Sequence, residues 1–409
     1  MDWADTPEQA AFRQEVRRFI DEGLPAYYKG VAANGGDLGG EGGWQTDRFL
    51  GSPEAKAAAL EWEKKVSDRG WVAPHWPKEY GGAGMSSMEQ FILKQEMAET
   101  GAPEVGGQGV AMLGPTVIAH GTEEQKKRFL PATLACEMVW CQGYSEPGAG
   151  SDLASLQTRG VRDGDEWVVN GQKIWTSNAH RANWIWMLVR TDPDAPKHRG
   201  ITFMLSSMDT PGIGVRPLIS GGGMHFSNET FYEDVRIPQS QVIGEVNRGW
   251  YVGMTLLDYE RSNISGAVES RREIERMLEH TAAGGPAADK RRPDFDSVRL
   301  EVADRYIETE VGFNFSFRII SMQNRGLIPN YEASTSKMFA SELNQRIQRT
   351  GTKVFGLNSQ VWDPEDPRAA YGARFTQNYF HTIPSTIAGG TSEIQRNIIA
   401  TRGLGLPRG

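Results

Sequence analysis

Apolar residues recur at helical spacing through the first third of the chain. The opening segment predicts a helix that Thr6 caps, with Pro7 at its first position and an end near residues 23–25. The same spacing predicts three more helices, over residues 55–68, 87–100 and 123–134. Residues 1–135 are therefore expected to form an all-α domain.

From residue 136 the period changes to that of strands. Residues 166–169 and 172–175 flank Asn170-Gly171, the favoured sequence of a two-residue turn, and so predict a hairpin. Further strands are predicted over residues 184–190, 201–205, 215–218 and 230–235. We therefore expect a β-domain over residues 136–246.

After Gly249 the helical period returns in long runs. They cover residues 250–283, 297–324, 333–355 and 391–402. The order α, β, α lacks alternating βαβ units, and no G-x-G-x-x-G lies between a strand and a helix. This pattern excludes the doubly wound dinucleotide-binding fold, so any cofactor must be bound in another way.

Composition narrows the classes of function. The 409 residues include 44 Lys+Arg against 52 Asp+Glu, and the short basic clusters form no stripe that tracks phosphates, which disfavours a nucleic-acid partner. Cys136 and Cys141 have no second cysteine pair and no partnered His, so we expect reduced packing thiols. The seven histidines form no metal motif, and no metal is expected. Without a signal sequence or a run of about 18 apolar residues, a cytoplasmic protein without a membrane partner is expected.

Two segments carry residues suited to ligand binding. Residues 144–152 place two glycines beside Ser151 and Asp152, which suits a loop whose N–H groups face carbonyl or phosphate oxygens; a plain turn is the alternative. Trp175 to Ser177 put an aromatic ring and hydroxyls at a strand end, against which a planar ring system can lie. The alternative for Trp175 is an ordinary core residue.

Five ordered segments of the chain resemble the signatures of the acyl-CoA dehydrogenase family. They are residues 76–82, 145–152, 170–175, 244–250 and 389–396. The resemblance implies an α+β fold with an N-terminal α-bundle (1–135), a middle β-barrel or sandwich (136–246) and a C-terminal four-helix bundle (247–409). It also implies FAD, an acyl-CoA substrate, an electron-transferring flavoprotein as acceptor, and a homo-oligomer, such as a dimer of dimers, with FAD at the dimer interface.

The resemblance further implies roles for individual residues. Those expected at the flavin ring are Gln142, Tyr144, Ser145, Gly150, Ser151, Trp175, Thr176 and Ser177. Those expected at the FAD phosphates and adenosine are Arg292, Thr391 and Glu393, with Arg292 reaching the neighbouring subunit's cofactor. Those expected at the CoA thioester are Ser151, Asp258, Arg261, Gly389 and Gly390. A surface ion pair would explain Asp258 and Arg261 equally well.

Desaturation of an acyl thioester requires a base that removes the α-proton while a hydride leaves Cβ. Many family members place a Glu directly before the Gly-Thr of the C-terminal signature, where this chain has Gly389. The family's other location, on the first helix of the C-terminal domain, matches Glu260. Helical spacing places Glu260 on an apolar face with Ile264 and Val268, where burial raises a carboxyl pKa and helps it act as a base. An ion pair with an arginine is the alternative.

The sequence thus predicts an FAD-dependent acyl-CoA dehydrogenase that forms a trans-2-enoyl-CoA from a branched, bulky or ring-bearing acyl group. The backbone N–H groups of Gly389 and Gly390 would polarise the thioester carbonyl. Two rival hypotheses are a non-catalytic or half-site subunit of a mixed tetramer, motivated by Gly389, and an acyl-CoA oxidase. His180 and His225, near the flavin loops, are interpreted as hydrogen-bonding residues.

Overall fold

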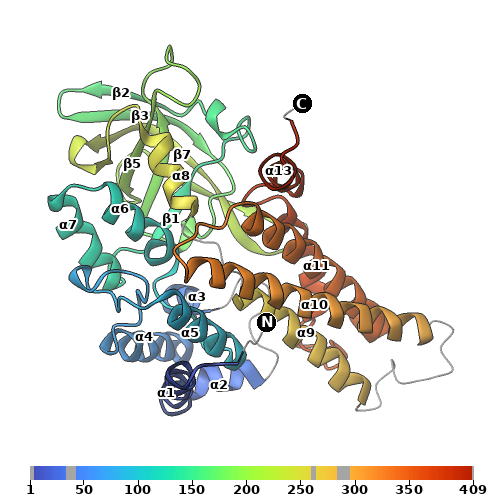
Figure 1. Ribbon diagram of the computed structural model, residues 1–409. Helices are drawn as coiled ribbons and strands as arrows, with labels where there is room; N and C mark the ends of the chain where they lie inside the picture. The colour runs from blue at the N-terminus through green and yellow to red at the C-terminus, as the bar shows by residue number, and fades with distance from the viewer. Residues whose placement is uncertain (1–3, 34–42, 259–263, 283–294, 408–409) are drawn as a thin grey trace. The chain divides into compact units, whose positions relative to one another are not determined.

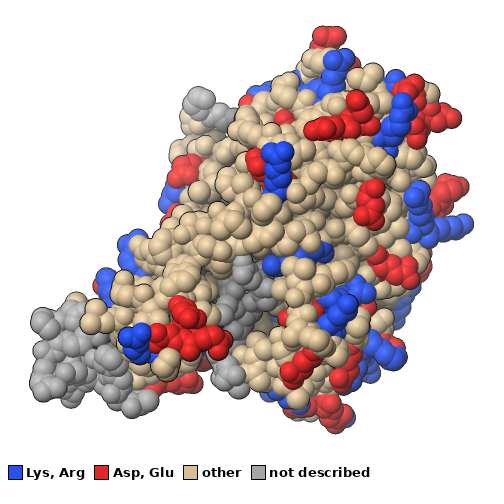
Figure 2. Space-filling model, turned by 180° about the vertical axis from the view of Figure 1, so that it is seen from behind, with Lys and Arg blue, Asp and Glu red and all other residues tan. Residues whose placement is uncertain are grey.

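The computed structural model describes residues 4–33, 43–258, 264–282 and 295–407 (Figure 1). They form two compact units: unit 1, from residues 1–42, 85–103 and 261–409, and unit 2, from residues 43–84 and 104–260. On the face drawn in Figure 2, acidic and basic side chains are interspersed. Within the described ranges, every helix is too short or too polar to cross a membrane.

Unit 1 is helical. Its helices are α1 (Pro7–Gly23), α2 (Ala26–Ala33), α5 (Ser87–Thr100), α9 (Ile264–Ala282), α10 (Phe295–Gln323), α11 (Tyr331–Phe355), α12 (Arg374–His381) and α13 (Ser392–Ile398). Single turns cover Gly356–Gln360, Ile383–Thr386 and Ile399–Gly403. The long helices α9, α10 and α11 lie side by side (Figure 1). The helices predicted over residues 297–324 and 333–355 are confirmed.

Local signals in the sequence set where α1 begins and ends. The Thr6 hydroxyl accepts a hydrogen bond from the Gln9 N–H, and the Gln9 side chain accepts one from the Thr6 N–H. Pro7 occupies the first turn, where its missing N–H costs nothing, and the helix ends at Leu24. The predicted cap and end of this helix are confirmed.

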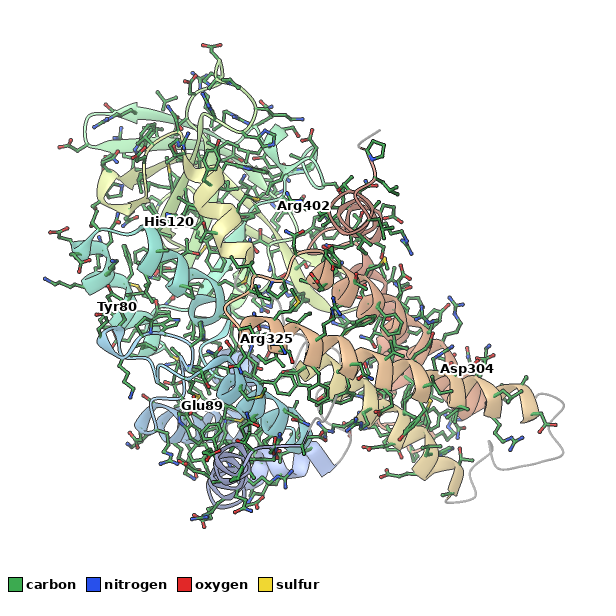
Figure 3. All side chains as sticks on the ribbon, in the orientation of Figure 1. Tyr80, Glu89, His120, Asp304, Arg325 and Arg402 are labelled. Atoms are coloured by element: carbon green, nitrogen blue, oxygen red, sulfur yellow. The ribbon has the colours of Figure 1, made fainter. Side chains whose placement is uncertain are left out.

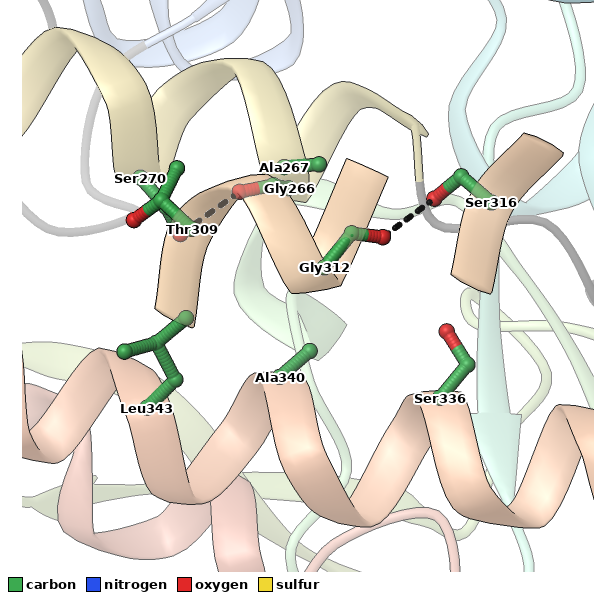
Figure 4. A pocket seen from close by; sticks show the side chains of 9 residues that line it. All are labelled: Gly266, Ala267, Ser270, Thr309, Gly312, Ser316, Ser336, Ala340 and Leu343. Atoms are coloured by element: carbon green, nitrogen blue, oxygen red, sulfur yellow. Dashed lines mark hydrogen bonds between the residues drawn. The ribbon is translucent and has the colours of Figure 1, made fainter. Parts of the chain in front are cut away.

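Mostly small residues line the place where α9, α10 and α11 meet (Figure 4). They are Gly266, Ala267, Ser270, Thr309, Gly312, Ser316, Ser336, Ala340 and Leu343. Ser270 and Ser316 donate to carbonyls of their own helices, those of Gly266 (2.9 Å) and Gly312 (3.3 Å). The space left holds about one water molecule, so we interpret this cavity as a consequence of close helix packing.

Unit 2 combines helices with an eight-stranded mixed sheet. Its helices are α3 (Trp44–Leu50), α4 (Pro53–Asp68), α6 (Gly114–His120), α7 (Glu123–Leu134) and α8 (Gly249–Asp258). Its strands are β1 (Trp140–Gly143), β2 (Arg159–Asp163), β3 (Glu166–Lys173), β4 (Trp184–Arg190), β5 (Ile201–Ser207), β6 (Ile213–Ile219), β7 (His225–Pro238) and β8 (Val242–Ile243). The strand order is β6-β7-β3-β2-β4-β5-β8, and β1 pairs in parallel with β4.

The predicted hairpin at Asn170-Gly171 is wrong. Strand β3 runs straight through both residues, and the turn lies at Gly164-Asp165, where Asp163 pairs with Glu166 and Gly164 has φ +61°. At Gly171 the pairing of β3 with β7 shifts register, and an added Cβ would meet Thr158 at 2.6 Å. Glycine is therefore required by a bulge in the strand, and not by a turn.

Buried apolar side chains fill unit 2. Strands β4 and β5 are buried along almost their whole length, as expected for central strands. His120, labelled in Figure 3, has its Nε2 3.0 Å from the Thr255 hydroxyl and so links α6 to α8. Cys136 and Cys141 are free and buried, which confirms the prediction of packing thiols.

Candidate functional site

Two segments of unit 2 that the sequence singles out lie side by side. Strand β1 ends at Gly143 and leads into residues 144–152, while β3 ends at Lys173 and leads into residues 175–177. The Ile174 N–H donates to the Ser145 carbonyl at 2.9 Å, which joins the two segments. The structure thus brings together the residues predicted to surround a flavin ring.

A buried ion pair holds the 144–152 loop on the sheet. The fully buried Lys173 Nζ donates to Glu146 Oε1 (2.8 Å) and to the Tyr144 carbonyl (3.1 Å). The Glu146 carboxylate also accepts from the N–H groups of Gln157 (2.6 Å) and Thr158 (2.9 Å). Four hydrogen bonds therefore fix the path of the loop.

Burial and charge oppose each other within this pair. Burial lowers the pKa of Lys173 to about 8, although the Glu146 carboxylate counteracts it. Burial also raises the pKa of Glu146, but the Lys173 charge and the hydrogen bonds outweigh that effect and keep this pKa below its ordinary value. Sequence reasoning missed both residues. The alternation of β3 carried a signal, because Lys173 falls on the inward face with Trp167 and Val169.

The indole of Trp175 is exposed to solvent. The backbone of this residue has φ +60° and its side chain is 63 % exposed. The next residue, Thr176, is fully buried, and its backbone exchanges two hydrogen bonds with Asn228, at 2.9 and 3.1 Å. The Asn228 amide also donates to the Thr176 carbonyl at 3.0 Å. An exposed aromatic face on an anchored strand end suits a planar ligand.

Two stacked histidines lie behind this strand end. The rings of His180 and His225 are 3.8 Å apart, and Asn228 bridges them: its Oδ1 lies 2.8 Å from His225 Nε2 and its Nδ2 lies 3.0 Å from His180 Nδ1. Because Nδ2 can only donate, His180 Nδ1 accepts and the ring is neutral. Burial first, then the charges of His225 and Arg181, lowers the pKa of His180 to about 4. The interpretation of both histidines as hydrogen-bonding residues is confirmed.

The remaining predicted ring-side residues differ in exposure. Gly150 and Ser151 are exposed, and their N–H groups have no acceptor in the described ranges. Gln142 and Ser177 are half-buried. Tyr144 is buried, which raises the pKa of its hydroxyl, and that hydroxyl has no hydrogen-bond partner among the described residues. Free N–H donors on this loop and an exposed indole on the adjoining strand end are groups that could bind a planar ring with acceptor atoms at its edge, which is the chemistry of a flavin.

The second predicted group lies in one turn of unit 1. Gly389 and Gly390 have φ +64° and +85°, and Thr391 caps α13 by accepting from the Ile394 N–H at 3.2 Å. The Glu393 side chain is mostly exposed, and hydrogen bonds to its own N–H and to Thr391 lower its pKa. These four residues therefore lie together within residues 389–393, at the start of α13.

Several predicted residues lie outside the described ranges. They are Glu260, Arg261 and Arg292; Asp258 ends α8, but its side chain is not described. Ile264 and Val268, predicted to share a face with Glu260, are fully buried. Among the residues that are described, no cluster of His, Cys, Asp or Glu is suited to hold a metal ion.

Known proteins match the chain along most of its length. Three family models match: the acyl-CoA dehydrogenase N-terminal domain over residues 52–137, the middle domain over 141–235 and the C-terminal domain over 247–404. Acyl-CoA dehydrogenase IpdE1 of Mycobacterium tuberculosis is 34% identical over 384 residues, which is 90% of this chain and 96% of the relative. Acyl-CoA dehydrogenase FadE26 of the same organism is 34% identical over 417 residues, 98% of each chain.

Solved structures also match the chain over its whole length. The steroid ACAD Tcur3481-Tcur3483 superposes with a TM-score of 0.83 at 36% identity and covers 100% of both chains. The ChsE4-ChsE5 complex from Mycobacterium tuberculosis superposes with a TM-score of 0.81 at 33% identity, again over 100% of both chains. The predicted α+β fold is confirmed.

Proposed function

The chain belongs to the acyl-CoA dehydrogenase family of FAD-dependent oxidoreductases, and on this premise we propose that Glu260 is its catalytic base. The substrate class is an acyl-CoA thioester, and Glu260 removes its α-proton. When bound, FAD accepts the hydride that leaves Cβ. The product is the trans-2-enoyl-CoA.

The backbone at residue 389 carries this proposal. Its φ of +64° lies in the left-handed region, where a residue with a side chain costs about 1–2 kcal/mol. The residue at 389 is a glycine, which this conformation favours and which supplies no carboxylate. The carboxylate must come from elsewhere, and Glu260 stands at the family's other position for it.

Other residues of the chain bind and orient the reactants. We propose that Trp175 stacks on the flavin ring, that Ser177 and the N–H groups of the 144–152 loop donate to its edge, and that the N–H groups of Gly389 and Gly390 donate to the thioester oxygen. We assign the rest of the FAD to Arg292, Thr391 and Glu393, and the CoA moiety to Ser151, Asp258 and Arg261. We further propose three domains with boundaries at residues 135/136 and 246/247.

We propose a bulky or ring-bearing acyl group as substrate. A Cβ at Gly389 would have its nearest neighbour, Lys337 Cε, at 3.9 Å, so the turn leaves open space where other members carry a carboxylate. The solved relative at 36% identity is described as a steroid ACAD, which supports the same class. We also propose an electron-transferring flavoprotein as the partner that takes up the electrons.

Replacement of the base tests the proposal. In Glu260→Gln, anaerobic bleaching of the flavin by a panel of straight, branched and steroid-like CoA esters should slow by about 10²- to 10⁴-fold, with FAD and thioester still bound. The matched control is Glu275→Gln, at an exposed position of α9, which should bleach at the wild-type rate. Retained bleaching in Glu260→Gln would place the base elsewhere.

The assembly has two candidates. We propose a homo-oligomer with FAD at the dimer interface, while the solved ChsE4-ChsE5 complex favours the alternative of a half-site subunit in a mixed assembly. The purified single chain separates them. A yellow, oligomeric protein whose flavin is bleached by a thioester supports the homo-oligomer, whereas a colourless chain supports the mixed assembly. Peroxide formation with oxygen would instead identify an oxidase.

A further inference from the structure

Two long side chains hold the Gly389–Thr391 turn by its carbonyl oxygens. Lys337, on α11, donates from Nζ to the carbonyl of Gly390 (2.6 Å) and to that of Ser385 (3.1 Å). Gln395, on α13, donates from Nε2 to the carbonyls of Gly389 (3.1 Å) and Gly390 (3.4 Å). Both carbonyls of the glycine pair are therefore directed toward side chains of the helices.

This arrangement fixes where the neighbouring N–H groups point. The described peptide bonds are all trans, so each N–H is directed opposite to the carbonyl of the same peptide plane. The N–H groups of Gly390 and Thr391 consequently point away from Lys337 and Gln395. In the part of the chain that the structure describes, the N–H groups of residues 389, 390 and 391 have no acceptor. The free N–H groups of Gly390 and Thr391 are therefore available to donate to a partly negative oxygen.

The close approach of Gln395 depends on glycine at position 390. A Cβ added there would lie 2.6 Å from Gln395 Nε2, closer than real contacts allow. The Gln395 side chain is 8 % exposed, so its amide is committed to these carbonyls and not to solvent. Glycine at position 390 therefore allows the Gln395 amide to approach the carbonyl oxygens of the turn.

Lys337 adds a positive charge to this arrangement. It is half-buried, and burial lowers its pKa, while Glu342 and Glu393 counteract that effect. Among the described residues no carboxylate lies within ion-pair distance of it, and Glu342 instead pairs with Arg396 at 2.6 Å. The ammonium group therefore acts on peptide carbonyls. A charged donor on a carbonyl polarises the peptide and strengthens its N–H as a donor.

We propose that Lys337 and Gln395 are positioning residues, which orient and polarise the N–H groups of Gly390 and Thr391 toward the thioester carbonyl oxygen of the substrate. The inference rests on the proposed function, because it takes the thioester to bind at this turn. Neither residue touches the substrate. Their effect passes through the peptide groups of Gly389 and Gly390. A greater negative charge on the thioester oxygen would then be stabilised as the α-proton leaves.

The carbonyl stretching frequency of a bound thioester reports this polarisation directly. We would bind ¹³C-carbonyl trans-2-octenoyl-CoA and cinnamoyl-CoA, one straight and one ring-bearing, to the FAD-loaded enzyme and record infrared difference spectra. The wild type should shift the carbonyl band to lower frequency than in water. Lys337→Met should lose most of that shift and lower kcat by about 10- to 100-fold, less than the 10²- to 10³-fold cost of removing an oxyanion donor itself.

Matched variants separate positioning from stability. Lys353→Met removes another α11 lysine, which pairs with Glu301 at 2.5 Å, and should keep the full shift. Lys337→Arg keeps the charge and should restore part of the shift. If Lys337→Met does not fold, Gln395→Met takes its place with the same expected loss.

The carbonyl shift and the flavin bleaching together distinguish a failure of this inference from a failure of the proposed function. A full carbonyl shift in a folded Lys337→Met or Gln395→Met overturns the inference. A weakened affinity for FAD with an unchanged carbonyl shift also overturns it, because the N–H groups would then serve the cofactor's phosphates. If neither thioester binds to or shifts in the wild type, and no CoA ester bleaches its flavin, the proposed function fails instead.

Discussion

The 144–152 loop of unit 2 and the 389–391 turn of unit 1 are both held by a lysine, but in different ways. Lys173 is fully buried and neutralised by Glu146, whereas Lys337 is half-buried and bonds, within the described ranges, to two peptide carbonyls. A buried charge that loses its partner is costly, whereas a lysine on a carbonyl leaves no charge behind. Lys173 is therefore expected to stabilise the fold, while Lys337 is available to tune a ligand site.

The largest effect is expected from Lys173→Met. Removing the ammonium leaves the Glu146 carboxylate buried without its counter-charge, which costs about 3–5 kcal/mol of unfolding free energy. Denaturant unfolding of unit 2, followed by tryptophan fluorescence, measures it. A double variant, Lys173→Met with Glu146→Leu, should regain part of the loss. If Lys173→Met is no less stable than Lys337→Met, the Lys173–Glu146 pair does not stabilise the fold more than the contacts of Lys337.

A surface pair on the same loop supplies the control. Lys197 bonds to Asp152, and both side chains are more than half exposed. Lys197→Met should change the unfolding free energy by at most about 1 kcal/mol. If Lys197→Met lost as much unfolding free energy as Lys173→Met, the burial of an ion pair would not explain how strongly it holds the loop.

A pair of alanine substitutions tests how the two glycines of the 389–391 turn differ. Gly389→Ala faces only backbone strain of about 1–2 kcal/mol, because its Cβ would have no neighbour closer than 3.9 Å. In Gly390→Ala the new Cβ also displaces the Gln395 side chain. Each hydrogen bond that Gln395 then loses to the turn carbonyls costs about 0.5–1.5 kcal/mol more. Thermal unfolding of both variants should rank Gly390→Ala as the less stable. Equal losses would contradict the role given to Gln395.

The pH dependence of stability tests the histidines behind Trp175. The pKa of His180 falls from 6.5 to about 4 on folding, so the unfolded chain takes up the proton first as the pH falls. The stabilising contribution is complete above pH 6.5 and is lost progressively toward pH 4. His180→Phe keeps a ring against His225 but removes the uptake of up to one proton on unfolding. The dependence of Tm on pH should therefore become flatter over this window. An unchanged slope would contradict a neutral, Asn228-bonded His180.

Much of the fold was predictable from local patterns. The cap at Thr6, the helices over residues 87–100 and 123–134, and the buried strand over 184–190 match the structure because each has its own periodicity and stop signals. Asn170-Gly171 was misinterpreted because a dipeptide favoured in turns also suits a bulge. The distinction depends on Thr158, which is distant in sequence and packs against Gly171.

The site was predictable only where its residues belong to recognisable sequence motifs. The ring-side loop and the glycine pair belong to recognisable signatures, but their supports do not stand out. Lys337 acts on residues some fifty positions away, and Asn228 holds Thr176 across the sheet. Such contacts depend on tertiary structure, which hydrophobic periodicity alone does not encode. The role of Glu260 stays a prediction, since it lies outside the described residues.

The position of the β2–β3 turn has a practical consequence for engineering. Gly164 and Asp165 are exposed, and nothing lies within 4 Å of a Cβ at Gly164, so a short epitope tag inserted there would project into solvent without disturbing the strand ladder. The same insertion at Asn170-Gly171 would cut β3 in two and break the paired hydrogen bonds between Asn170 and Asp234. A label for immobilisation or imaging therefore belongs six residues earlier than the dipeptide that looks most like a loop.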